Sequence, residues 1–113
     1  MCAKSDQAGE LYKKAYQSEQ QGEATLAEVY YLKSWSLFEQ AGGSNYLNAA
    51  NALNALAFLR WSRRNYEGAL CSAKRSMRIM ETHESELSGA DADLIRNTSW
   101  DLIDQVSYEM SLR

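Results

Sequence analysis

The chain has 113 residues, a formal net charge of −3 and 45% hydrophobic residues. This hydrophobic content suits one small globular domain and excludes an intrinsically disordered chain. Proline is absent, and alanine, leucine, glutamate and lysine are plentiful, a composition typical of an all-α fold. No apolar run approaches the roughly 20 residues that span a bilayer. Residues Met1 to Asp6 lack the features of a secretory signal, so we expect a cytoplasmic protein with no membrane partner.

Two cysteines, Cys2 and Cys71, are the only candidates for a disulfide. A single pair does not form the framework that small secreted domains use for stability. We expect Cys71 to be a small core residue and Cys2 to be an exposed thiol near the chain end, with no bond between them.

The first predicted helix runs from about Asp6 to Gln21, and the second from about Ala24 to Gln40. Gly42 and Gly43 end the second helix, because glycine readily adopts the left-handed conformation of a helix C-cap. Together these elements form a first predicted hairpin over residues 6–43.

The third predicted helix begins at Ser44 or Asn45, either of which can cap it, and runs to about Arg64. A turn at Asn65 leads into a fourth helix, which we expect from Tyr66 to about Thr82. These two helices form a second predicted hairpin over residues 44–83.

A polar loop, 83–90, separates the second hairpin from a last predicted helix over residues 91–113. Asp91 and Asp93 favour the start of this helix through the helix dipole. We expect this lone helix to cover the exposed face of the second hairpin, as the terminal helix of a repeat protein does.

A shift of 42 residues aligns side chains of the same kind along the chain. Small, apolar and aromatic residues recur in this one register: Ala8, Ala50 and Ala92; Leu11, Leu53 and Ile95; Ala15, Ala57 and Ser99; Tyr16, Phe58 and Trp100; Ala27 and Ala69; Ser34 and Ser76. The alignment predicts two hairpins of the same kind followed by one helix.

Residues 55–79, ALAFLRWSRRNYEGALCSAKRSMRI, resemble a tetratricopeptide repeat. The resemblance rests on the pair Leu56-Ala57, on Tyr66 before the second helix, on Ala69 within it, and on Ser76 in place of a later alanine. The first hairpin matches through fewer residues: Ala15, Gly22, Ala27, Tyr30, Tyr31 and Ser34.

The chain departs from the family pattern at Arg60 and Ala73, which stand where aromatic residues are usual, and it lacks the helix-ending proline. Its 42-residue period exceeds the family's common unit of about 34 residues and is similar to the kinesin light chain type of repeat. The resemblance implies an α-solenoid of five antiparallel helices in a single domain, 1–113. An alternative is a helical bundle similar to the microtubule-interacting-and-trafficking domain, which does not account for a fifth helix.

The same resemblance implies a concave groove, lined by the first helix of each pair, that holds a peptide or a partner helix. Carried over position by position, the lining residues are Tyr12, Tyr16, Asn51, Asn54, Phe58, Trp61, Arg96 and Trp100. Three of these aromatics would form a ladder, one per helix, and the two asparagines can hydrogen-bond a peptide backbone. The alternative, in which the aromatics pack between repeats as core, stays open. We therefore expect a scaffold that binds a protein or peptide of unknown identity.

A second interpretation starts from a run of basic residues: Arg60, Arg63, Arg64, Lys74, Arg75 and Arg78. Such a cluster can bind nucleic acid or an acidic protein partner. Nucleic acid ranks lower, because the chain as a whole is acidic. Apolar residues Leu32, Trp35 and Phe38, if they face outward, also make a homo-oligomer a reasonable expectation.

Signals for catalysis are weak. His83 is the only histidine, and although Glu84 and Glu86 lie close to it, no further histidine or cysteine follows at metal-ligand spacing. The chain has no phosphate-cradling glycine loop and no nucleophile-elbow serine. We expect no enzyme activity, no metal and no cofactor.

Overall fold

The structure is a computed structural model that describes residues 3–112. Within this range the chain forms five α-helices and no strand: α1 (Ala3–Gln20), α2 (Ala24–Ala41), α3 (Asn45–Ser62), α4 (Tyr66–Thr82) and α5 (Ala90–Ser111). The predicted all-α class is confirmed, and each predicted helix boundary within this range lies within one helical turn of an observed one.

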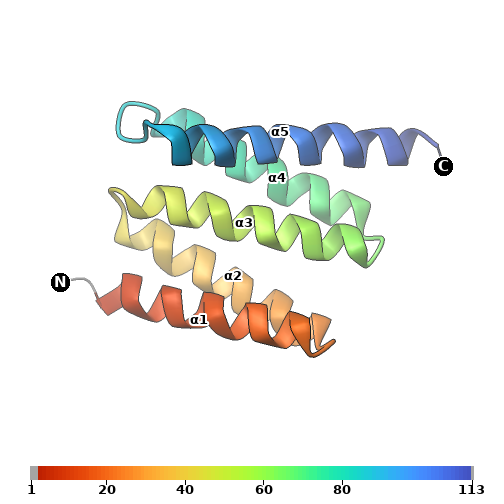
Figure 1. Ribbon diagram of the computed structural model, residues 1–113, viewed down its shortest axis with the longest axis horizontal. Helices are drawn as coiled ribbons and strands as arrows, with labels where there is room; N and C mark the ends of the chain where they lie inside the picture. Colours follow the sequence, from red (N-terminus) through yellow and green to blue (C-terminus); the bar gives the residue numbers. More distant parts are fainter. Residues whose placement is uncertain (1–2, 113) are drawn as a thin grey trace.

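The helices lie in two layers (Figure 1). Helix α1 packs against α2, α3 packs against α4, and α5 packs against both α4 and α3. In the view of Figure 1, helices α1, α3 and α5 form the near layer and helices α2 and α4 lie behind them. The result is a flat molecule of 47 × 32 × 19 Å, whose two broad faces are made by different sets of helices.

Small residues form much of the core. Ten alanines of the described residues are fully buried, and they lie on all five helices: Ala8, Ala15, Ala27, Ala49, Ala50, Ala52, Ala57, Ala69, Ala73 and Ala92. Because alanine adds little bulk, helix backbones approach closely at these positions and larger side chains fill the space between them. The large buried side chains are Tyr31, Leu53, Leu56, Met80, Leu102 and Val106.

The 42-residue alignment recurs in the geometry of the hairpins. The Ser34 hydroxyl on α2 donates to the backbone oxygen of Ala8 on α1 at 2.8 Å. In the second hairpin, the Ser76 hydroxyl donates to the backbone oxygen of Ala50 at 3.0 Å. Both hydroxyls are fully buried, so each bond satisfies a polar group that has no access to water.

A chain of buried polar groups attaches α5 to the second hairpin. The Ser99 hydroxyl on α5 lies 3.0 Å from that of Ser76 and 2.9 Å from Asn54 Oδ1. Asn54 Nδ2 donates to the backbone oxygen of Ile95 at 3.2 Å. The last helix therefore lies on the second hairpin, where the sequence predicted it.

The ends of the helices follow their local sequence. Gly42 and Gly43 have positive φ angles and end α2, as predicted. Asn65 caps α4, because its Oδ1 accepts a hydrogen bond from the Gly68 amide at 3.1 Å. Ser44 stands at the N-cap of α3 but makes no side-chain capping bond.

Two predictions about burial are wrong. Cys71 is exposed, because it lies on the outer side of α4 while Ser72 and Ala73 face inward. Phe38, expected on an outer surface, is a buried core residue. The prediction for Cys2 lies outside the described residues.

Among residues 3–112, no helix combines the length and the apolar character that a bilayer crossing requires.

Candidate functional site

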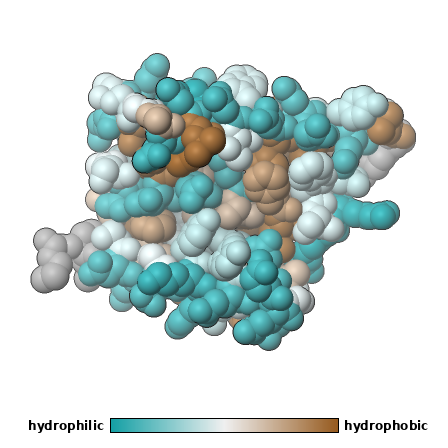
Figure 2. Space-filling model, viewed as in Figure 1, coloured by the Kyte–Doolittle hydropathy of each residue, from teal (hydrophilic) through white to brown (hydrophobic). Residues whose placement is uncertain are grey.

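A hollow of about 200 Å³ lies between α3 and α5. Its lining is mostly apolar and comes from the two helices: Phe58, Trp61, Thr98, Asp101, Leu102 and Gln105. We call it the α3–α5 groove. Figure 2 shows hydrophobic surface between these two helices and a further hydrophobic area near the start of α5.

Two aromatic rings form the α3 wall of this groove. Phe58 and Trp61 lie one turn apart on α3, and their ring centroids are 6.3 Å apart. The Trp61 indole N–H donates to a carboxylate oxygen of Glu109 on α5 at 2.6 Å. Phe58 has no such partner, and 45% of its surface is exposed. The ring of Phe58 is therefore the freer of the two to meet a ligand.

Three other predicted residues lie on α1 and α3, where these helices meet. Asn51 Nδ2 lies 3.4 Å from the Tyr12 hydroxyl, and the Tyr12 ring packs edge-on against buried Tyr31 at 5.4 Å. Burial raises the pKa of the Tyr12 phenol above its ordinary value of 10.0. Tyr16 is exposed. Tyr12 is thus partly core, whereas Tyr16 and Asn51 face solvent.

Tyr31 was not among the predicted site residues, and it is a buried core residue with a polar tip. Its hydroxyl donates to a carboxylate oxygen of Glu19 at 2.8 Å. Burial, and then this bond and the charge of Glu19, raise the pKa of Tyr31 far above its ordinary value. The phenol therefore stays protonated and links α2 to α1.

The prediction that Asn54 binds a peptide is wrong. Its side chain is buried, with 3% of the residue exposed. The amide donates to Ile95 and accepts from Ser99, so its hydrogen-bonding groups are occupied within the fold. Its position on α3 places it under α5, where a ligand cannot reach it.

The remaining predicted residues do not join the α3–α5 groove. Arg96 forms an ion pair with Asp93 one turn before it, at 3.0 Å. Trp100 lies with Met77 and Ile103 at a separate hollow of about 250 Å³ between α4 and α5.

Tyr16, Phe58 and Trp100 thus occupy equivalent positions and are exposed to similar extents, 55%, 45% and 50%. Among the described residues, the only ring that contacts Phe58 is that of Trp61. No ring contact joins any two of these three aromatics in the part of the chain that the structure describes.

The basic cluster is divided by the fold. Arg60 and Arg63 both pair with Glu28 on α2, at 3.4 Å each. Arg60 also donates to the Ser72 hydroxyl at 2.8 Å, and these bonds tie α3 to both α2 and α4. Arg60 is therefore held within the fold, whereas Arg63 is an exposed partner of the same carboxylate.

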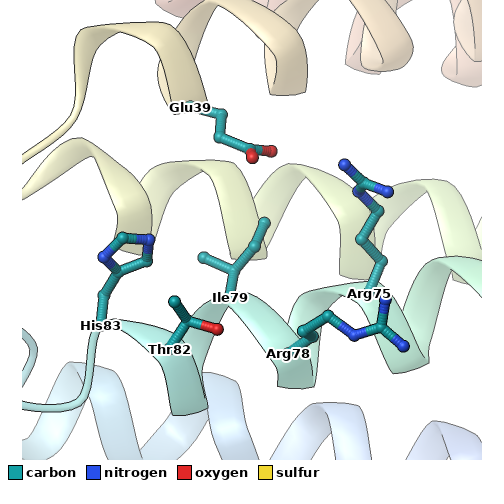
Figure 3. Close-up of a pocket in the computed structure, with 6 residues that line it drawn as sticks. All are labelled: Glu39, Arg75, Arg78, Ile79, Thr82 and His83. Carbon is teal, nitrogen blue, oxygen red and sulfur yellow. The ribbon is translucent and has the colours of Figure 1, made fainter.

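Two other members of the cluster lie at a different hollow. Arg75 and Arg78 line a space of about 170 Å³ together with Glu39, Ile79, Thr82 and His83 (Figure 3). His83, which ends α4, stacks on the Tyr46 ring with the ring centroids 3.5 Å apart. Glu39 was not predicted at this hollow, because its place depends on how the first hairpin packs against the second.

In the described part of the chain, no three histidine, cysteine, aspartate or glutamate side chains gather as a metal site requires. No protein-family model, curated protein or solved structure matches this chain. The resemblance to tetratricopeptide repeats stays a prediction.

Proposed function

We propose that this chain is a helical-hairpin repeat protein of the tetratricopeptide kind that acts as a protein-interaction scaffold. In this proposal, a peptide or partner helix lies in the α3–α5 groove. The repeat assignment is supported by the two buried serine-to-carbonyl bonds, which recur 42 residues apart at Ser34–Ala8 and Ser76–Ala50.

The observation that carries the binding proposal is the exposed Phe58 ring beside Trp61 at an apolar hollow. Aromatic residues at the centre of a small pocket with a polar rim commonly supply most of the energy of an interface. Asp101 and Gln105 provide the polar rim on the α5 side. The groove is therefore suited to an apolar anchor residue with a basic residue next to it.

The alternative partner, nucleic acid, has less support. A nucleic acid backbone is held by several cations spread along a track. Here two of the six basic residues of the cluster, Arg60 and Arg63, are paired with Glu28. The basic surface that remains for a nucleic acid backbone is therefore shorter than the sequence suggested.

The test is selection of peptides from a displayed random library on the wild-type chain, followed by calorimetric affinities for variants. Phe58→Ala should weaken binding of a selected peptide by about tenfold or more, because it removes the exposed anchor of the groove. Trp100→Ala is the matched control, since it removes an aromatic of similar exposure from the separate α4–α5 hollow. Helical circular dichroism should be unchanged in both variants.

Failure to select any peptide would argue against a peptide scaffold. If Trp100→Ala abolished binding and Phe58→Ala did not, the ligand would lie between α4 and α5, and the α3–α5 groove would not be the site.

A further inference from the structure

The other layer of the molecule holds a second groove, between α2 and α4. It consists of two adjoining hollows, of about 170 and 350 Å³, which share Glu39 and Arg75 as lining residues. One hollow carries Arg78, Thr82 and His83, and the other extends past Trp35 to polar residues of α2. We call the whole the α2–α4 groove. It shares no lining residue with the α3–α5 groove.

Two guanidinium groups at this groove lack acidic partners. Arg75 and Arg78 lie one turn apart on α4, and neither forms an ion pair with a carboxylate of residues 3–112. The Arg75 guanidinium lies over the Trp35 ring, 4.7 Å from its centroid. This contact holds the cation in place while leaving its N–H edge free to donate.

The other polar groups fit an oxygen-rich anion with a limited charge. The side chains of Thr82 and His83 line the same hollow as the arginines (Figure 3), and the threonine hydroxyl can donate. Glu39 is the one acid that lines the hollow, and its Oε1 accepts from the Trp35 indole N–H at 2.7 Å. Glu86 lies outside the lining, 3.4 Å from His83 Nδ1.

We infer that the α2–α4 groove binds a phosphorylated side chain of an extended partner peptide. A phosphate monoester carries about −1.5 to −2 charges and three acceptor oxygens. The guanidinium groups of Arg75 and Arg78 point in different directions in Figure 3, and Arg78 also lines the α4–α5 hollow, so binding requires these long side chains to turn toward one phosphate beside the Thr82 hydroxyl. Ser36 and Gln40 line the adjoining hollow, where the peptide backbone on one side of the phosphate can meet their polar groups. A nucleic acid fits less well, because Glu39 lies between the two hollows and interrupts any continuous basic track.

The experiment is an NMR titration that follows the arginine side chains and the Trp35 indole. The probe is a short glycine- and alanine-based peptide with one phosphoserine. Its unphosphorylated form, inorganic phosphate and a ten-uridine RNA serve as comparisons at constant ionic strength. The phosphopeptide should give saturable shifts at Arg75, Arg78 and Trp35, with a dissociation constant on the order of 1 mM.

Substitutions of the basic and the acidic residues of this groove should change the affinity for the phosphopeptide in opposite directions. Arg78→Gln should weaken phosphopeptide binding about tenfold, through loss of charge-assisted hydrogen bonds. Glu39→Gln should tighten it about threefold, since it removes the one repelling charge and keeps an acceptor for Trp35. Arg64→Gln is the matched control, because it removes one arginine charge outside the groove, and it should leave the affinity unchanged.

Several outcomes would overturn the inference: no saturable shifts, equal shifts with the unphosphorylated peptide, or equal weakening by Arg64→Gln. Binding of inorganic phosphate as tight as that of the phosphopeptide would assign the site to a free anion. Tighter binding of the RNA would assign it to nucleic acid.

Discussion

At the scale of single residues, the two interfaces of the near layer use different chemistry at equivalent positions. Asn54 and Ser99 form a buried hydrogen-bonded pair between α3 and α5. The residues 42 positions earlier are Tyr12, whose ring packs edge-on against Tyr31, and Ala57, a buried residue with no polar side chain. The polar pair is a buried link between α5 and α3, whereas the hydrogen bond from Asn51 to Tyr12, which joins α3 to α1, is exposed.

Asn54→Ala should lower the free energy of unfolding by about 1–3 kcal/mol, because it removes the buried hydrogen bonds that Asn54 makes to Ser99 and to the Ile95 backbone oxygen. Urea denaturation followed by circular dichroism measures this loss. Asn51→Ala is the matched control, at an exposed position one turn earlier on α3, and should change stability little. Equal effects of the two substitutions would show that the buried network does not stabilise the α5 contact.

The sequence misassigned Asn54 for a physical reason. A helical pattern shows that Asn51, Asn54 and Phe58 share one side of α3, but the burial of each depends on where the next helix lies along that side. Helix α5 covers Asn54 and leaves Phe58 at the edge of a groove. That these residues share one side of α3 was predictable, whereas their accessibility was not.

At the scale of elements, the two hairpin turns have the same backbone path. Gly22, between α1 and α2, has a φ of 81°, and Arg64, between α3 and α4, has a φ of 62°. The residues that follow, Glu23 and Asn65, also agree closely, with φ and ψ of −91° and 68° against −88° and 74°. Glycine suits this left-handed position, and arginine adopts it only at a cost.

Arg64→Gly should therefore raise the free energy of unfolding by about 0.5–1 kcal/mol, despite the greater freedom of glycine in the unfolded chain. Thermal and urea unfolding measure the gain. Gly22→Ala, at the equivalent turn, should lose a similar amount. A loss of stability in Arg64→Gly would mean that the arginine side chain contributes more than its backbone conformation costs.

Element boundaries were the most predictable part of this fold, because glycine and asparagine mark the turns in the sequence itself. The contacts between elements were harder to predict from the sequence. Glu28 and Arg60 are far apart in sequence, and their pairing follows from the packing of α2 against α3. The α2–α4 groove went unnoticed in the sequence for the same reason, since Trp35 and Glu39 reach it from the other hairpin.

At the scale of the whole molecule, α5 covers the side of the second hairpin that would otherwise be open. Ala57 on α3 and Ala73 on α4 are fully buried in one cluster with Leu102 of α5. Without that helix, this apolar surface would face water.

A chain that ends at Ser88 should lose at least roughly 3 kcal/mol of unfolding free energy and should associate, because it exposes the apolar surface that α5 covers. Urea denaturation and light scattering after size-exclusion chromatography measure the two effects. A shortened chain that stayed monomeric and equally stable would show that α5 is not needed to cover the second hairpin.

The buried bond from Ser34 to Ala8, repeated from Ser76 to Ala50, has a consequence for how the molecule can vary. A slide of α2 by one turn would bring Tyr30 or Phe38 against the backbone at Ala8, where only a small side chain fits. These bonds therefore fix the position of each helix along its partner, whatever packs against the outside of the hairpin. Side chains such as Phe58 and Arg75 can be exchanged to suit a different ligand without altering the framework that presents them.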